Sequence, residues 1–430
     1  MTEVDLIFNP YLIILLICII YIFLYAKYGF TNPIAIFYGC IALYVPIKYY
    51  FVVLMGLEFA SSSIEKFGKS FQLFAISNGG YLILIFLLLS AIFQSIFKVM
   101  IKKQKIIGIF IKNPMAIPTV MLSGFIFFLF LLFNPFSALL DGLTFRTFTQ
   151  TKGMAYLTLV FDTLSLISIY QYLENSKLAK LSFLMLYLAF FYFLNGRSGP
   201  IVLMGLFIFV YLFSVKGFVP TKSILLAGIA LFIFALIHGA IRTQGDLILA
   251  LAFIAEGSQN DIFFMTAFIE RISQLEEFSV LSQLISDGKI QIDFLSPLNV
   301  FTQFIPRAFW DEKPFFFNTN IMSIVYPEIQ SEGVNFAFLG LGEFIYSFGF
   351  TFGLILASIV MGFLLSTCDN YLKVTKNNGE VFLFFYFIPY YCLIAGFNDG
   401  WLNTAVMPTI LINLLTFKAL GKFHEMPLKR

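Results

Sequence analysis

The chain has 430 residues, of which 60% are hydrophobic, 19% aromatic and only 12% charged, and its formal net charge is +3. Soluble domains are usually about 45–50% apolar and about 25% charged, so this composition excludes a soluble globular protein. Apolar runs of about 20 residues recur along the chain, and a run of that length crosses a bilayer as a helix. The sequence therefore predicts an all-α, polytopic integral membrane protein.

Eleven apolar windows are long enough to cross. They cover residues 9–27, 33–56, 78–98, 114–134, 153–173, 179–195, 199–215, 222–242, 337–366, 380–397 and 401–420. The second window contains Pro46 and Lys48, and Lys48 either extends its ammonium group to the interface or lines a cavity. The first window follows the acidic stretch MTEVD, so a retained helix is expected there in place of a cleaved signal peptide.

The chain is thereby divided into three regions. Residues 1–242 hold eight helices, residues 243–336 form one large external segment, and residues 337–430 hold three helices and a short tail. The loop after the third window carries a cluster of lysines: Lys98, Lys102, Lys103, Lys105 and Lys112. The positive-inside rule makes this loop cytoplasmic, and alternation then puts the N-terminus outside and the C-terminal tail inside.

Arginines are distributed differently from lysines. Five of the six arginines fall on the external side or at the external helix ends: Arg146, Arg197, Arg242, Arg271 and Arg307. Guanidinium offers a rigid fork of donors that matches phosphate and keeps its charge in a poorly hydrated site. This distribution indicates an anionic ligand at the outer membrane surface, such as a lipid phosphate or diphosphate. Anchoring of the arginines in the headgroup layer is the alternative.

The external segment begins with an amphipathic pattern in FFMTAFIERISQLEEFSVLSQLI. The apolar face comprises Met265, Phe268, Ile272, Leu275, Phe278 and Leu281, and the polar face comprises Glu270, Ser273, Gln274, Glu276 and Glu277. Such a helix lies along the membrane interface or packs onto the bundle, and a structural lid or strut is favoured over a catalytic role. The next stretch, SDGKIQIDFLSPLN, predicts a turn with a short extended piece.

A rigid turn is expected at IPRAFWDEKP. Pro306 and Pro314 restrict the backbone, and Trp310 suits the interfacial layer, so the turn would hold Arg307 and Lys313 at the level of the headgroups. The four cysteines lie within or beside apolar windows and lack metal-binding or disulfide spacing: Cys18, Cys40, Cys368 and Cys392. Neither zinc nor a structural disulfide is expected.

Several of these stretches resemble elements of the Wzy-type O-antigen and oligosaccharide repeat-unit polymerases. IPRAFWDEKP resembles that family's IPR-x-x-W-x-x-KP element, and GVNFAFLGLGEFIYSFGFTFG resembles the segment that follows it into the next helix. FRTFTQTKGMAYL and NGRSGPIVL resemble two upstream elements, an arginine-containing loop and a short Arg-Ser/Gly turn. The likeness covers roughly residues 141 to 353 in order, together with the topology.

The resemblance implies a glycosyltransferase of the GT-C type in the bacterial inner membrane. Such an enzyme joins oligosaccharide units carried on undecaprenyl diphosphate at the periplasmic face, transferring the growing chain to an incoming unit. The implied partners are the lipid-linked donor and acceptor, membrane lipid and a chain-length regulator protein, without nucleic acid or an organic cofactor. The polymer would be O-antigen, capsule or a related surface polysaccharide.

Transfer breaks the bond between the anomeric carbon and the diphosphate, so fixed cations should stabilise the leaving group. Arg197 and Arg307 are the predicted catalytic cations, and Arg146, Arg242 and Lys313 are predicted diphosphate contacts. Glu343 is the preferred general base, since an acid at membrane depth indicates function, although a structural pair with an arginine is the alternative. Asp311, Glu332 and Asp399 remain as other bases or as charge balance. Asp311-Glu312 lacks the Asp-x-Asp spacing for a divalent ion, so metal independence is predicted.

Two other functions remain open. An O-antigen ligase or a peptidoglycan-type polymerase shares the chemistry, but a ligase would be expected to need an external histidine, whereas His238 falls in a predicted helix and His424 in the cytoplasmic tail. A flippase or transporter of the lipid-linked unit would be expected to place charge along its path, whereas the predicted spans are nearly free of charge.

Overall fold

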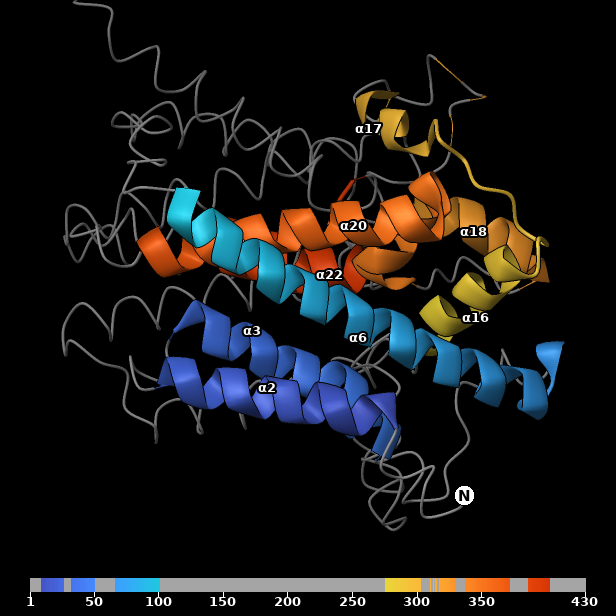
Figure 1. Cartoon of the computed structure of the whole chain (residues 1–430). Coiled ribbons are helices and arrows are strands. Elements are labelled where there is room, and N and C mark those ends of the chain that lie inside the picture. Colours follow the sequence, from blue (N-terminus) through green and yellow to red (C-terminus); the bar gives the residue numbers. More distant parts are fainter. Residues whose placement is uncertain are drawn as a thin grey trace, which may run out of the picture.

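The computed structural model describes residues 9–26, 32–50, 66–100, 275–302, 310, 312, 314, 317–328, 337–371 and 386–402. Within these ranges the backbone is almost entirely helical and contains no β-strand, so the all-α prediction is confirmed for them. The main helices are α2 (Pro10–Ala26), α3 (Pro33–Ala42), α6 (Lys69–Met100), α16 (Leu275–Ser286), α20 (Leu339–Tyr371) and α22 (Gly396–Asp399) (Figure 1). Shorter elements are η1 (Leu43–Ile47), η3 (Ser296–Leu298), α17 (Asn299–Thr302), α18 (Phe317–Val325) and η5 (Tyr386–Ala395).

Three of the described helices are long and apolar enough to cross a membrane, namely Pro33–Tyr50, Lys69–Met100 and Leu339–Asn370. The chain is thus a membrane-associated helical protein. The windows predicted at 9–27, 33–56, 78–98, 337–366 and 380–397 each overlap a described helix, although residues 51–56 and 380–385 lie outside the described residues. The windows from 114–134 to 222–242, and nearly all of 401–420, lie outside the described residues, so the count of eleven stays a prediction.

The first two helices begin at the same sequence pattern, Asn-Pro. The Asn9 side chain accepts the Tyr11 backbone N–H at 3.0 Å, and the Asn32 side chain accepts that of Ile34 at 2.9 Å. Proline suits the first helical position because its missing N–H would be unpaired there, and asparagine satisfies one of the other free donors. This pattern explains why both helices start where the apolar windows start.

α2 runs parallel to α6. Near the start of both helices the Tyr11 hydroxyl donates to the Ile76 carbonyl at 2.7 Å, and further along both the Gln94 amide donates to the Tyr25 hydroxyl at 3.0 Å. α3 runs the opposite way, because the α2 tyrosines meet its residues in reverse order: Tyr11 stacks on Tyr49, and Tyr21 on Tyr38.

α6 and the part of α20 after Gly349 also run parallel and pack closely. Ser358 donates to the Phe86 carbonyl at 3.3 Å, and near the helix ends Lys98 pairs with Asp369 at 2.7 Å. A side chain at Gly362 would meet the backbone of α6 around Phe93, so glycine permits the close approach that membrane helices commonly use. We call the end at which α2 and α6 begin the Lys69 end, and the opposite end the Lys98 end.

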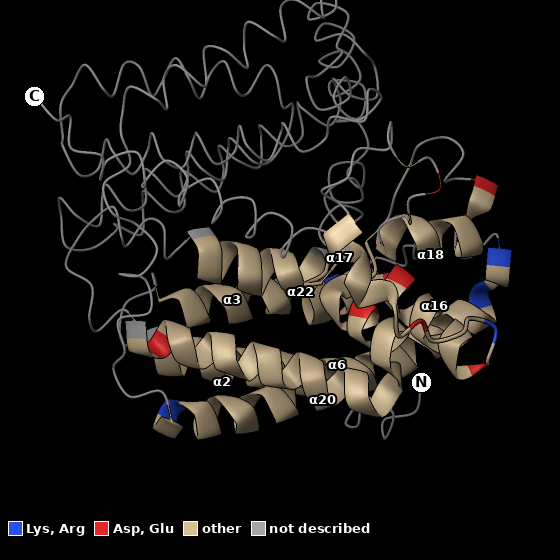
Figure 2. Cartoon of the chain, turned by 90° about the horizontal axis from the view of Figure 1, so that it is seen from above, with Lys and Arg blue, Asp and Glu red and all other residues tan. Residues whose placement is uncertain are grey.

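The helix directions agree with the predicted numbering of the spans. The sequence numbers α2, α6 and α20 as spans one, three and nine, and alternation requires odd-numbered spans to run the same way. The predicted cytoplasmic face corresponds to the Lys98 end and the predicted external face to the Lys69 end. Figure 2 shows charged residues toward the two ends of the described helices, with long uncharged stretches between them.

α20 is interrupted at Gly349. This glycine has φ 76° and ψ 175°, a conformation that essentially only glycine adopts. The Tyr346 carbonyl, which lies just before the break, accepts the backbone N–H of Asp293 at 3.0 Å. The two parts of α20 fold back on each other at this break, because a side chain at Gly353 would meet the backbone of Phe344. The break also frees a backbone acceptor on α20, and the segment that follows α16 supplies its donor.

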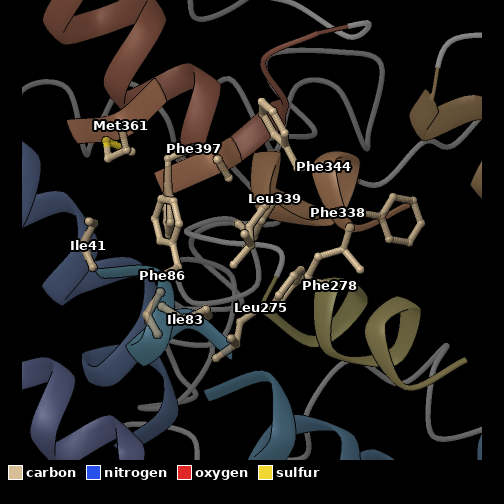
Figure 3. Packing of buried hydrophobic residues seen from close by; sticks show 14 of the residues in the cluster. Ile41, Ile83, Phe86, Leu275, Phe278, Phe338, Leu339, Phe344, Met361 and Phe397 are labelled. Carbon is tan, nitrogen blue, oxygen red and sulfur yellow. The ribbon is translucent and has the colours of Figure 1, made fainter. Parts of the chain in front are cut away.

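α16 is buried between the first half of α6 and the start of α20. In Figure 3, Leu275 and Phe278 lie between Ile83 of α6 and the start of α20, and both are fully buried. Every residue from Leu275 to Ile285 is buried, including the two glutamates of the predicted polar face. The expected amphipathic surface is therefore wrong over 275–285, whereas the alternative of packing onto the bundle is observed. The rest of the predicted helix, from Met265 to Gln274, lies outside the described residues.

The turn predicted after α16 is present. Gly288 has φ 69°, and the Lys289 N–H returns to the Leu284 carbonyl at 2.9 Å, a common way for a helix to end at glycine. Residues 291–293 have no regular secondary structure and lead to the short turns η3 and α17, so the predicted extended piece stays a prediction.

Candidate functional site

Of the predicted site residues, Glu343 is the one whose side chain the structure describes. The others lie outside the described residues: Arg146, Arg197, Arg242, Arg307, Asp311, Lys313 and Glu332. Asp399 ends α22, and only its backbone is described. Whether the arginines converge on one ligand therefore stays a prediction.

Glu343 lies in the first turns of α20 and is fully buried. Its carboxylate accepts the backbone N–H of Leu402 at 2.7 Å, which ties the chain after α22 to the start of α20. The sequence allowed two roles for Glu343, a general base or a structural partner of an arginine. The structure adds a backbone partner, which neither role anticipated.

Trp401 packs at the place where the chain after α22 meets the start of α20. Its indole N–H donates to the Cys392 carbonyl at 2.6 Å, and its ring meets Phe344 edge-on with centroids 5.8 Å apart. A side chain at Gly340 would collide with the Gly396 carbonyl and the Trp401 ring. The two candidate bases Glu343 and Asp399 thus come from segments that pack together, because Asp399 precedes Trp401 by two residues.

A second charged group lies at the same end of the bundle. Lys48 follows the π-helical turn η1, is 3% exposed, and pairs with Glu276 of α16, which is 4% exposed, at 2.7 Å. Extension of Lys48 to the interface is therefore wrong, whereas lining of a cavity, the other alternative drawn from the sequence, stays a prediction. We call Lys48, Glu276 and Glu277 the Lys48 cluster.

Glu277 is the third member of this cluster and is also buried. Burial, and then the neighbouring Glu276 carboxylate, raise the pKa of Glu277 to about 8, against a smaller lowering by Lys48. Its Oε2 atom has no hydrogen-bond partner among the described residues. Near neutral pH the cluster therefore combines one ammonium, one carboxylate and one protonated carboxyl group, with no net charge.

The pH dependence of stability should reveal this protonated carboxyl. The folded-state pKa lies above the ordinary 4.5, so the stability that Glu277 contributes is complete below about pH 4.5 and is lost as pH rises through about 8. We expect the free energy of unfolding of the parent protein to fall by up to about 1.4 kcal/mol per pH unit across this window because of Glu277. The Glu277→Gln variant should have a flatter profile. Equal slopes, measured by denaturant unfolding in detergent micelles, would contradict the assignment.

The Lys48 cluster and Glu343 are joined through α16. A side chain at Gly342, the neighbour of Glu343, would meet Phe278 and Leu281 at 3.3 Å, and Phe278 lies one residue beyond Glu277. The sequence missed Glu276 and Glu277 because adjacent acids in a helix normally face water. Lys48 was the feature of the sequence that could have predicted a buried acid, since a lysine inside an apolar window needs a buried partner.

In the part of the chain that the structure describes, no group of three His, Cys, Asp or Glu side chains could hold a metal ion. The described cysteines are all free. Comparison of the whole chain with protein-family models, curated proteins and solved structures finds no match. The assignment of function therefore depends on the residues themselves.

Proposed function

We propose that this chain is a membrane glycosyltransferase that polymerises oligosaccharide units carried on a polyprenyl diphosphate at the external face. The proposal starts from the four sequence elements between residues 141 and 353, which resemble those of repeat-unit polymerases in the same order. It also starts from the external position predicted for five of the six arginines. Undecaprenyl diphosphate is the carrier that the resemblance implies.

The observation that carries the proposal is the buried carboxylate of Glu343 near the start of α20. The element GVNFAFLGLGEFIYSFGFTFG includes the start of α20, and α16 of the predicted external segment packs against that same start. An acid buried in an apolar helix costs free energy, so a sequence keeps it for pairing or for chemistry. The position of Glu343 in the part of α20 that packs against α16 supports an active site at the external face.

In the proposed reaction the anomeric carbon of the growing chain leaves its diphosphate oxygen and bonds to a hydroxyl oxygen of the incoming unit. The hydroxyl proton passes to a carboxylate, for which we propose Glu343, and the bonding electron pair stays on the departing lipid diphosphate. Arg197 and Arg307 are proposed to stabilise that developing charge, with Arg146, Arg242 and Lys313 holding the diphosphate. Asp311, Glu332 and Asp399 would balance charge or replace Glu343 as the base.

The placement of charge favours a transferase over a flippase. In α6 the charges of Lys69 and Lys98 lie near the ends. In α20 Asp369 lies near the end, whereas Glu343 is an acid in the part that folds back at Gly349. The buried charge of Lys48 is neutralised by Glu276. A path for a diphosphate headgroup would need unneutralised cations at intermediate depth, and the described helices provide none there.

The test is the length distribution of surface glycan in cells that carry single variants at normal protein levels. We expect Glu343→Gln to lower chain extension by about 10²- to 10⁴-fold, the usual contribution of a general base. Arg197→Ala and Arg307→Ala should lose about 10²- to 10³-fold each. Glu328→Gln is the matched control, since Glu328 is an exposed acid at the same end of the bundle.

Two outcomes would contradict the proposal. Long chains in all three variants would remove the catalytic assignment. Loss of the lipid-linked unit from the outer leaflet after gene deletion would favour a flippase, whereas a polymerase leaves single units outside that are never extended.

A further inference from the structure

The lengths of α6 and α20 locate the membrane boundary. The Lys98–Asp369 pair marks one interface, and the hydrocarbon core of a bilayer is crossed by about 20 helical residues. Counting back that far from the pair reaches Asn78 on α6 and Gly349 on α20. The residues of α6 before Asn78 include Ser70, Gln72 and Ser77, as expected for a part beyond the hydrocarbon.

The segment after α16 lies beside α20 at this boundary. Asp293 donates its backbone N–H to Tyr346, and Ile292 lies 3.1 Å from the position that a side chain at Gly349 would take. Residues 292 and 293, at the start of the segment, are therefore level with the kink at which α20 folds back. Figure 1 shows α17 standing away from the main described helices at this end.

Five large apolar side chains of this segment are exposed, which we call the 292–301 patch. They are between 39% and 69% exposed: Ile292, Phe294, Leu295, Leu298 and Phe301. From Phe294 to Thr302 the sequence carries no charge. An apolar surface of this kind is uncommon on water-facing loops and typically marks a membrane or protein contact.

Local hydrogen bonds hold the patch in its exposed form. The Asp293 carboxylate accepts the Leu295 N–H at 3.0 Å, and the Asp293 carbonyl accepts the Ser296 N–H at 3.2 Å. The Thr302 hydroxyl donates to the Asn299 carbonyl at 2.7 Å. These bonds satisfy several backbone groups within the segment, the Tyr346 carbonyl accepts the Asp293 N–H, and the apolar side chains stay exposed.

We infer that the 292–301 patch is seated in the outer leaflet, with its side chains against lipid acyl chains just below the headgroups. The patch begins at the depth of the kink at Gly349, which lies at the hydrocarbon boundary. Apolar side chains exposed at that depth contact acyl chains, so lipid is favoured over a water-facing partner. The neighbouring Lys289 lies on the headgroup side, where its ammonium suits lipid phosphate. The patch would fix the depth of the external segment and hence of Glu343 relative to the membrane surface. This inference depends on the proposed orientation in the membrane and is independent of the reaction.

The inference is tested with single cysteines, Leu298→Cys and Phe301→Cys, in the full-length chain with its four native cysteines replaced by alanine. Each variant is labelled with an environment-sensitive fluorophore and reconstituted in phosphatidylethanolamine–phosphatidylglycerol liposomes. Quenching is compared between nitroxide lipids labelled near the headgroup, nitroxide lipids labelled near the chain end, and aqueous iodide. Ile92→Cys on mid-α6 and Glu328→Cys are the deep and aqueous controls, since both side chains are exposed.

We expect both patch positions to be quenched about twofold more by nitroxide near the headgroup than by either other quencher, as for an interfacial segment. Ile92 should respond most to the deep nitroxide and Glu328 to iodide. Dominant quenching by iodide at both patch positions would overturn the inference. Protection from all three quenchers would also overturn it, because the patch would then be covered by protein.

Discussion

Replacing Lys48 by methionine is expected to destabilise the protein by about 3–5 kcal/mol, the usual cost of leaving one partner of a buried ion pair uncompensated. Glu276 would then keep a buried charge beside Glu277, with no cation among the described neighbours to offset it. Glu276→Gln should have an effect in the same direction, because the ammonium of Lys48 then remains buried. The measurement is denaturant unfolding in detergent micelles, followed by the fluorescence of the two tryptophans, Trp310 and Trp401.

Two further variants show whether the pair itself is responsible. Lys48→Met combined with Glu276→Leu removes both charges, so its stability should return most of the way toward that of the parent protein. Lys66→Met is the surface control, since the Lys66–Glu328 pair is exposed and 3.9 Å apart, and it should change stability by less than about 1 kcal/mol. A double variant as unstable as the sum of its single variants would show that Lys48 and Glu276 act independently.

Gly340→Ala is expected to cost about 1–3 kcal/mol or more, because its methyl group would meet the Gly396 carbonyl and the Trp401 ring. A backbone carbonyl cannot rotate away as a flexible side chain can, so the turn at 400–402 must shift. The shift would weaken the bond from the Leu402 N–H to Glu343. Chain extension in cells should therefore fall together with stability.

Gly39→Ala is the matched control for that substitution. Gly39 lies inside α3, and a methyl group added there would meet nothing within 4 Å, so alanine should be neutral or stabilise the helix by up to about 1 kcal/mol. Equal unfolding free energies for the two alanine variants would show that the start of α20 is not tightly packed against Trp401.

Helices were predictable where length and apolar composition decide the structure. The windows beginning at residues 9 and 33 start with Asn-Pro, so both the span and its first residue could be read from the sequence. α6 exceeded its window because residues 69–77 are too polar to count as a span and yet continue the helix beyond the membrane boundary. The kink at Gly349 has no signal of its own, since FGFTFG offers two glycines and only the packing around Ile292 distinguishes them.

The candidate site was predictable only in part. Glu343 stood out because it is an acid within an apolar run, but its partner Leu402 is 59 residues away and bonds through its backbone, which any residue has. Lys48 stood out for the same reason, and its partner lies 228 residues away. Glu276 was assigned to water because helical periodicity reports the two faces of one helix and carries no information on a buried cation brought in from another segment.

The central claim is most directly tested by reconstituting the purified protein in liposomes with lipid-diphosphate-linked oligosaccharide units. We predict a ladder of longer lipid-linked products that forms equally with or without a chelator. Glu343→Gln, Arg197→Ala and Arg307→Ala proteins that elute as the parent does should leave the units as monomers, and Glu328→Gln should give the full ladder. Movement of single units across the bilayer without elongation, or ladders of parental length from all three variants, would contradict the account.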